Sequence, residues 1–471
     1  MEEIRDNPRL EPCWGVTPGA SIDLYGGYEG FEKELEINSI RAVRLFPRDH
    51  VFSLGDWMTE KTFKIFDRRK MVVFIDLDQV FLQSGMYDYD ANGLDRIDYL
   101  SKKYPGISFI LTRVGYRAYQ SIINLLSNSS NLHIDLSFLG THLGVEDIVK
   151  RFGCEKIVFG TSYPLVDPGG ALARLQFSGL NADEKSRIGS TNLENLLNRV
   201  VNYKDPVDLP SPTYPLYNSL NIEVTDAHCH LGQYYKFAIP NPDLKGMIEV
   251  MDASGVARAC ISSHLAITSD WELGNKLTLE ARDQFPDRFI GQVVVSPVEP
   301  HCIKKEITKY IDHLGFKAIK VVPDTHLKAI TSKEYEPMWE AAAERNCLVL
   351  SHTFHGSNMD SPSLFAELAE KYPSVPILIV HSGALTAGFP EAIRIAKSYP
   401  NLYLDVSGSY ITGPWIKNMV EDLGPEKVVF SSDMPFIDLR YSLGRVLYSG
   451  LSPNDIKLVL GGNIRRLLNL G

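Results

Sequence analysis

Short apolar runs alternate with helical patterns through the second half of the chain, from Ile222 onward. The runs recur about every 25 to 35 residues, which is the spacing of strands joined by helices in a parallel sheet. Eight runs of strand type end near Ala227, Ser263, Val295, Val322, His352, His381, Val406 and Ser432, and helical patterns between them include residues 332–346, 363–371 and 390–397. Eight such units in about 250 residues predict an α/β fold with a TIM-like (β/α)8 barrel.

Polar residues alternate with small ones at the end of the first of these runs, in the order Asp226, Ala227, His228, Cys229, His230. In a β-strand successive side chains point to opposite faces, so Asp226, His228 and His230 are expected on one face and Ala227 and Cys229 on the other. Two imidazoles on one face at the end of a strand form half of a metal site.

Three more polar residues close later strand patterns. His352 ends the fifth run, His381 ends the sixth, and Asp433 directly follows the eighth. In a TIM barrel the catalytic residues lie at the carboxyl ends of the strands. The sequence therefore predicts that the remaining ligands of a metal site come from these positions.

The two halves of the chain resemble each other. Residues 41–47, 131–137 and 155–159 match residues 317–323, 401–407 and 426–430. The shift is about 270 residues throughout, which indicates an internal duplication. The first copy begins near Pro8 and has no counterpart of the segment that carries His228 and His230.

The first copy also differs at the candidate ligand positions. Asp76 stands where the second copy has His352, Arg113 where it has His381, and Ser162 where it has Asp433; we therefore predict a scaffold without metal chemistry in residues 1–202, a proline-rich linker at 203–221 and the barrel at 222–471. Because an incomplete copy must cover its open sheet edges, we expect the halves to pack as an intrachain pseudo-dimer, and further homo-oligomerisation is open.

Composition excludes several classes of partner. The chain has 471 residues, 44% of them hydrophobic, and a net charge of −10, which argues against binding to nucleic acid or to an anionic membrane. There is no apolar stretch of the roughly 20 residues that a membrane helix needs, and the N-terminus lacks the apolar core of a signal peptide. The six cysteines form no C-x-x-C pair. These features predict a reduced, cytoplasmic protein that acts on a small molecule.

The chain resembles the amidohydrolase superfamily, in the branch described as amidohydrolase-related or amidohydrolase 2. The resemblance rests on the Asp226–His230 motif, on the segments at 315–320, 351–352, 380–383 and 431–435, and on the closing segment at 462–468. It covers the second half, and the first half as a truncated, degenerate copy. Members of this branch include hydrolases, lactonases, hydratases and non-oxidative decarboxylases of small acids.

The resemblance implies one divalent ion, held by His228, His230, His352 and Asp433. Zn²⁺ is the metal expected first, and Mn²⁺ or Fe²⁺ are alternatives. His381 is implied to orient or deprotonate the attacking water, or to polarise the substrate. Lys320 aligns near a position that bridges two metals in some members, but it stands two residues before the predicted strand end. A second metal is therefore not expected.

The function predicted from these residues is hydrolysis of an amide, lactone or ester bond of a small molecule, with Asp433 and His381 as the catalytic residues. A non-oxidative decarboxylase of a small carboxylic acid, with the same ligands, is the first alternative. A non-catalytic scaffold with a vestigial site is the second. Arg113 of the first copy is a further candidate, because some decarboxylases of this branch borrow an arginine from a neighbouring subunit.

Overall fold

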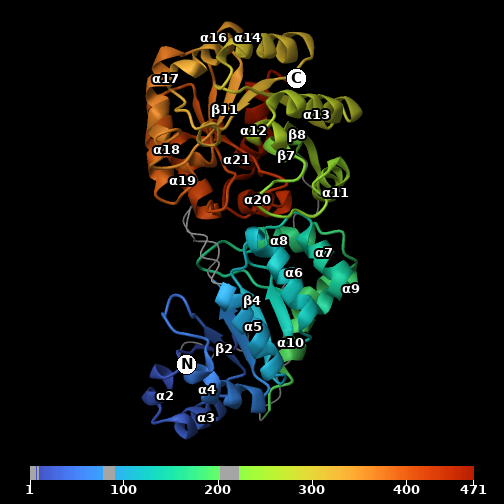
Figure 1. Cartoon of the computed structure of the whole chain (residues 1–471), viewed down its shortest axis with the longest axis vertical. Coiled ribbons are helices and arrows are strands. Elements are labelled where there is room, and N and C mark those ends of the chain that lie inside the picture. Colours follow the sequence, from blue (N-terminus) through green and yellow to red (C-terminus); the bar gives the residue numbers. More distant parts are fainter. Residues whose placement is uncertain (1–6, 8–9, 78–90, 202–221, 471) are drawn as a thin grey trace. The chain divides into compact units, whose positions relative to one another are not determined.

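The computed structural model describes residues 7, 10–77, 91–201 and 222–470, and these fall into two compact units (Figure 1). The first unit contains the described residues up to Leu139, together with Gly144–Thr161 and the described chain from Gly179. The second unit contains the chain from Ile222 and two segments of the N-terminal half, Gly140–Leu143 and Ser162–Ser178. The predicted linker at 203–221 lies outside the described residues.

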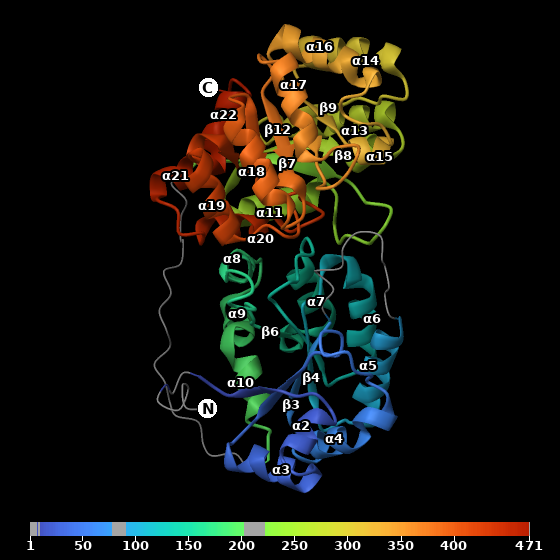
Figure 2. The same ribbon diagram turned by 90° about the vertical axis from the view of Figure 1, so that its left-hand side faces the viewer.

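The first unit is a parallel sheet of six strands that pair in chain order. The strands are β1 (Cys13–Gly15), β2 (Ala42–Leu45), β3 (Val72–Asp76), β4 (Ser108–Thr112), β5 (Leu132–Asp135) and β6 (Ile157–Val158). Its helices are α2 (Ala20–Leu24), α3 (Tyr28–Ile37), α4 (Asp56–Arg68), α5 (Ala91–Lys103), α6 (Tyr119–Asn128), α7 (Gly144–Phe152), α9 (Ala182–Ser186) and α10 (Asn192–Leu197). Strand and helix labels can also be followed in the rotated view of Figure 2. An open parallel sheet agrees with the predicted incomplete barrel.

The second unit is an eight-stranded parallel sheet whose strands also pair in chain order. The strands are β7 (Val224–Leu231), β8 (Val256–Ser263), β9 (Phe289–Val294), β10 (Ala318–Val321), β11 (Leu348–His352), β12 (Ile377–Val380), β13 (Leu402–Asp405) and β14 (Val428–Val429). The sheet closes on itself, because Ala227 N–H donates to the carbonyl of Phe430 at 3.1 Å and Cys229 forms a parallel bridge with Met434. The predicted TIM-like barrel is confirmed.

Helices separate the strands of this barrel. They are α11 (Leu244–Ser254), α12 (His264–Thr268), α13 (Trp271–Gln284), α14 (Pro300–Ile307), α15 (Pro323–His326), α16 (Glu336–Arg345), α17 (Phe365–Lys371), α18 (Gly388–Ser398), α19 (Gly413–Leu423), α20 (Leu439–Leu447), α21 (Pro453–Lys457) and α22 (Asn463–Leu467). One further helix of the second unit, α8 (Gly169–Gln176), comes from the N-terminal half. The three helical patterns predicted from sequence correspond to α16, α17 and α18.

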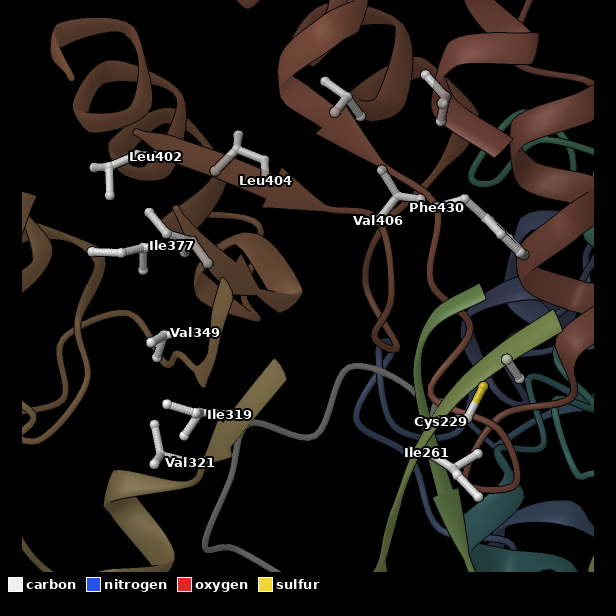
Figure 3. Packing of buried hydrophobic residues seen from close by; sticks show 14 of the residues in the cluster. Cys229, Ile261, Ile319, Val321, Val349, Ile377, Leu402, Leu404, Val406 and Phe430 are labelled. Carbon is white, nitrogen blue, oxygen red and sulfur yellow. The ribbon is translucent and has the colours of Figure 1, made fainter. Parts of the chain in front are cut away.

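Side-chain alternation along β11 places its buried residues in two different core clusters. Val349 and Ile377 belong to the cluster that packs strands against helices (Figure 3). Leu348 and Leu350, which flank Val349 in β11 and point to the opposite face, belong to a second cluster that includes Ile464 of α22. Each fully buried side chain of this size contributes about 1.5–3 kcal/mol relative to an exposed one.

The alternation predicted for the first barrel strand breaks within β7. Pairing with β8 shifts register between Asp226 and Cys229, and Ala227 and Cys229 pack in different core clusters. The prediction that these two side chains share a face is therefore wrong. An extra residue in one strand rotates the chain locally, which sequence alternation alone does not reveal.

Unusual backbone conformations recur at positions that the predicted duplication pairs. Arg113 and His381 have φ values of 54° and 63°, and Ser162 and Asp433 have values of 53° and 66°. A positive φ is uncommon for residues other than glycine. The duplication and the domain boundaries stay predictions, and these shared conformations support the duplication.

Two predictions about the cellular setting can be compared with the structure. Over the part of the chain that is described, no helix combines the length and apolar character required to cross a bilayer. All six cysteines lie in this part, and each is a free thiol. The cytoplasmic location stays a prediction.

Candidate metal centre and active site

His228, His230 and Asp433 bring three potential metal-ligand atoms together. The Nε2 atoms of the two histidines are 2.9 Å apart, and Asp433 Oδ1 lies 3.7 Å from that of His228 and 3.5 Å from that of His230. Asp433 N–H donates to the carbonyl of His228 at 2.9 Å. This backbone bond joins β7 to the segment after β14, so residues more than 200 positions apart in sequence meet at one point.

Asp226 connects the same two segments through hydrogen bonds to their backbones. Its Oδ1 accepts the backbone N–H groups of His228 at 3.1 Å and of Ser432 at 3.0 Å. The side chain is fully buried, and burial raises its pKa to about 6. Asp226 thus acts as a hydrogen-bond acceptor that fixes the positions of His228 and Asp433.

His352 lies in a second cluster, with Asp324 and Asp360. Its Nδ1 is 2.9 Å from Asp360 Oδ2 and 3.3 Å from Asp324 Oδ1. Burial acts to lower the pKa of His352, but the two carboxylates outweigh it and raise the pKa above its ordinary value. A carboxylate on Nδ1 is the usual arrangement for a histidine that offers Nε2 to a metal.

His381 joins the two clusters. Its ring centroid is 5.3 Å from that of His228 and 5.1 Å from that of His352. Its Nδ1 is 2.8 Å from Ser407 Oγ, and its backbone N–H donates to Asp405 Oδ1 at 2.6 Å. The structure therefore brings all five predicted site residues to one end of the barrel, as three convergent donors with His381 and His352 beside them.

Asp405 and Ser407 are shared supports that the sequence interpretation missed. Ser407 Oγ donates to both oxygens of Asp405 and also lies 3.4 Å from His228 Nδ1. Asp405 Oδ2 is 3.4 Å from the same nitrogen. A signal existed, because residues 401–407 repeat residues 131–137, and Ser137 makes the same two bonds to Asp135.

Lys320, which aligns near the metal-bridging position of some family members, lies at the site. It lies within β10, is 1% exposed, and places Nζ 2.8 Å from His228 Nε2. Burial lowers the pKa of the Lys320 ammonium group, against the opposing effect of Asp433. Burial also raises the pKa of the Asp433 carboxyl group. Lys320 therefore places a buried amino group next to the candidate ligands.

Aromatic rings cover one side of His230. The rings of His264 and Phe436 lie 4.9 Å and 5.8 Å from it, and the ring of Tyr234 is 4.5 Å from that of Phe436. His264 is buried, its Nδ1 is 2.6 Å from the carbonyl of Gly232, and burial lowers its pKa to about 4. This wall limits the access of water to His230.

The corresponding place in the first unit contains ion pairs. Arg113 Nε lies 2.5 Å from Asp76 Oδ1, and Arg44 Nη2 lies 3.0 Å from Asp76 Oδ2. Arg113 also pairs with Asp49 at 2.9 Å. Two guanidinium groups thus surround the carboxylate that stands in place of His352. The role considered for Arg113 in the barrel site stays a prediction.

The barrel residues fit one divalent ion. Burial lowers the pKa of His228 and of His230 well below the ordinary value, so both imidazoles are neutral, as metal ligation requires. The Nδ1 atoms face protein partners, which are Asp405 and Ser407 for His228 and Ser262, at 3.2 Å, for His230. The two Nε2 atoms converge with Asp433, and Lys320 Nζ also lies 2.8 Å from that of His228.

The barrel half of the chain matches a known protein family in sequence. The sequence profile of the family described as amidohydrolase matches residues 225–470. The chain belongs to the amidohydrolase family. The predicted family and the predicted class of amidohydrolase-like enzyme are confirmed. Within this family the chain is 22% identical to gamma-resorcylate decarboxylase of Polaromonas sp. (strain JS666 / ATCC BAA-500) over an alignment 289 positions long, which covers 47% of this chain and 86% of the relative.

Solved structures with similarity to this amidohydrolase include two decarboxylases. The 5-carboxyvanillate decarboxylase of Sphingomonas paucimobilis has a TM-score of 0.44 and 15% identity, with 53% of this chain and 100% of that chain covered. The 2,6-dihydroxybenzoate decarboxylase of Rhizobium has a TM-score of 0.43 and 18% identity, with 53% and 99% covered.

Proposed function

We propose that the barrel is a metal-dependent, non-oxidative decarboxylase of a small carboxylic acid. The observation that carries the proposal is the convergence of His228, His230 and Asp433 beside the buried Lys320. Such a site can attract a carboxylate. The similarity to a gamma-resorcylate decarboxylase favours removal of the carboxyl group over the hydrolysis predicted first.

The proposed ligands are His228, His230, His352 and Asp433, with Zn²⁺ as the first metal to test and Mn²⁺ or Fe²⁺ as alternatives. A divalent ion bound there supplies a concentrated positive charge that orients an acidic substrate. Lys320 brings an amino group to the same side, within hydrogen-bond distance of His228. Asp360 and the Asp405–Ser407 pair keep the histidine rings in place through their Nδ1 atoms.

Decarboxylation breaks the bond between the substrate's carbon skeleton and its carboxyl carbon. Carbon dioxide leaves, and the electron pair that stays on the skeleton takes up one proton. We assign that proton to a carboxyl oxygen of Asp433, which lies at the centre of the site. His381, fixed by Ser407, is assigned to orient the substrate, and Phe436 with Tyr234 keeps water away.

The test uses the full chain reconstituted separately with Zn²⁺ and Mn²⁺. Hydroxylated aromatic acids and aliphatic acids are incubated with it in D2O, and the release of carbon dioxide and the deuterium content of the product are measured. We expect one deuterium at the carbon that lost the carboxyl group. The His228→Ala/His230→Ala double variant should lose both metal and turnover.

Lactones, amides and esters form the second arm of the same experiment. Hydrolysis of any of these without release of carbon dioxide from the acids would overturn the decarboxylase proposal in favour of a hydrolase. A chain that takes up no metal even after reconstitution would indicate a scaffold with a vestigial site. The Asp183→Ala variant, which removes an exposed carboxylate of α9, is the matched control.

A further inference from the structure

Helix α8 of the N-terminal half is in close backbone contact with helix α20 of the barrel. A Cβ atom added at Gly169 would overlap the carbonyl oxygen of Gly444, and one added at Gly444 would overlap that of Gly169. A Cβ atom at Gly170 would overlap the ring of Tyr441. Since only glycine allows this approach, α8 has a fixed position on α20.

Two arginines stack on the same aromatic ring at this contact. The guanidinium carbons of Arg174 from α8 and Arg445 from α20 lie 4.8 Å and 4.7 Å from the ring centre of Tyr441. Both arginines are buried. Arg445 Nη1 donates to the carbonyl oxygens of Gly408 and Ile411, each at 2.8 Å. The stack is therefore connected to the segment 406–412, which joins β13 to α19.

Asp167 connects the N-terminal half to the end of the same segment. Its Oδ2 accepts the backbone N–H of Gly413, the first residue of α19, at 2.7 Å. Its Oδ1 accepts that of Gly169 at 3.1 Å. One carboxylate thus ties the start of α8 to the start of α19.

The segment 406–412 forms part of the candidate site. It contributes Ser407, which bonds His381 Nδ1, and Gly408, where an added Cβ atom would lie only 3.2 Å from the same nitrogen. A displacement of this segment therefore changes the position of the His381 ring directly. His228 would also be affected, since Ser407 Oγ is 3.4 Å from its Nδ1.

An aspartate of the barrel, in turn, bonds the backbone of the N-terminal half. Asp438 follows Asp433 at the same distance as Asp167 follows Ser162. It accepts the N–H of Leu143 at 3.1 Å, and Asp438 N–H donates to the carbonyl of Gly140 at 2.8 Å. Exchange of equivalent contacts is the pattern of a symmetric dimer interface. Here it occurs within one chain.

We propose that the segment 162–178 of the N-terminal half positions the active-site segment 406–412, with Asp167 and Arg174 as positioning residues for His381. The part of this inference that concerns catalysis rests on the proposed function. It gives the half without metal ligands a role in the reaction: it holds the orientation of a residue in the other half.

The test is amide hydrogen exchange of the full chain, followed by mass spectrometry, on Asp167→Ala and Arg174→Met. We expect exchange at residues 406–413 to rise about 10-fold or more, as loss of a charged hydrogen bond implies. Bound metal should stay at the unmodified level, because no proposed ligand is changed. On a substrate that is turned over, kcat should fall with little change in KM, since His381 orients the reacting group.

Conservative variants separate positioning from general stability. Asp167→Asn retains one acceptor for Gly413 N–H and Arg174→Lys retains a cation over Tyr441, so both should restore most of the protection and most of kcat. Asp183→Ala is the control. Unchanged exchange at 406–413 in Asp167→Ala, or a lower Tm with unchanged exchange and kcat, would overturn the inference. Because exchange is read without turnover, a failure to find a substrate leaves this readout decisive.

Discussion

Asp360→Asn is the most direct test of the ligand role of His352. The side chain of Asp360 is 0% exposed and its Oδ2 lies 2.9 Å from His352 Nδ1. The substitution keeps the size of the side chain and removes its charge. The second carboxylate at this nitrogen, Asp324, is 44% exposed and 3.3 Å away, so water competes for it. The buried bond should therefore supply most of the orientation.

The expected magnitude follows from the loss of one buried carboxylate partner. Such losses typically weaken metal binding about 10- to 100-fold. This corresponds to about 1.4–2.7 kcal/mol of binding free energy. Asp360→Asn also lowers the pKa of His352, which reduces proton competition and favours metal binding. At pH 8 proton competition is small, so the effect of lost orientation should dominate.

The assay is competition for the metal between the protein and a chelator of known affinity, at pH 8, for the unmodified chain, Asp360→Asn and Asp324→Asn. We expect the large loss only for Asp360→Asn and less than about a threefold loss for Asp324→Asn, as for an exposed charge. Equal affinity for all three proteins would show that His352 is no ligand. An equal loss for both variants would refute the argument from burial.

Three further predictions concern stability. Arg113→Met removes one of the two guanidinium groups paired with the buried Asp76 and should destabilise the first unit by about 3 kcal/mol in urea unfolding without changing bound metal; a loss of metal would contradict the separation of the two sites. Burial lowers the pKa of His133 to about 4, so the unfolded state takes up the proton first as pH falls below about 6.5. Unfolding free energy should therefore drop by about 2 kcal/mol from this group between pH 7.5 and pH 5, and a His133→Gln variant with the same pH dependence as the unmodified chain would refute the assignment. Residues 222–471 expressed alone lose α8 and should aggregate or dimerise through α20; a stable, metal-loaded monomer in size-exclusion chromatography would contradict the predicted pseudo-dimer.

The predicted barrel and the five candidate residues depend on local patterns. The spacing of apolar residues that is typical of strands and helices can be recognised in the sequence. His228, His352 and Asp433 are polar residues at the ends of apolar runs. Because the carboxyl ends of parallel strands meet at one end of a barrel, their approach follows from the fold class. The prediction that the first copy lacks metal ligands needed only the identities of the residues at the aligned positions. Asp76, which aligns with His352, ends strand β3 and pairs with Arg113.

Other parts of the site depend on geometry that no local pattern encodes. The register shift in β7 separates Ala227 from Cys229, and only the pairing with β8 shows it. Lys320 lies before a strand end, yet its long side chain reaches His228 across the barrel. Asp360 is on a loop eight positions after His352, where residue type alone does not distinguish it from a surface aspartate.

The sequence by itself determined the fold class, the family and the chemical identity of the candidate ligands, because periodicity and residue type are properties of short segments. The tertiary structure alone decided which atoms meet: the Nδ1 partners that orient each histidine, and the Gly169–Gly444 contact that joins the two halves of the chain. These contacts form between residues far apart in sequence, and small differences in register and packing determine whether they form. The separation between local pattern and long-range contact explains why the ligands could be predicted and their supports could not.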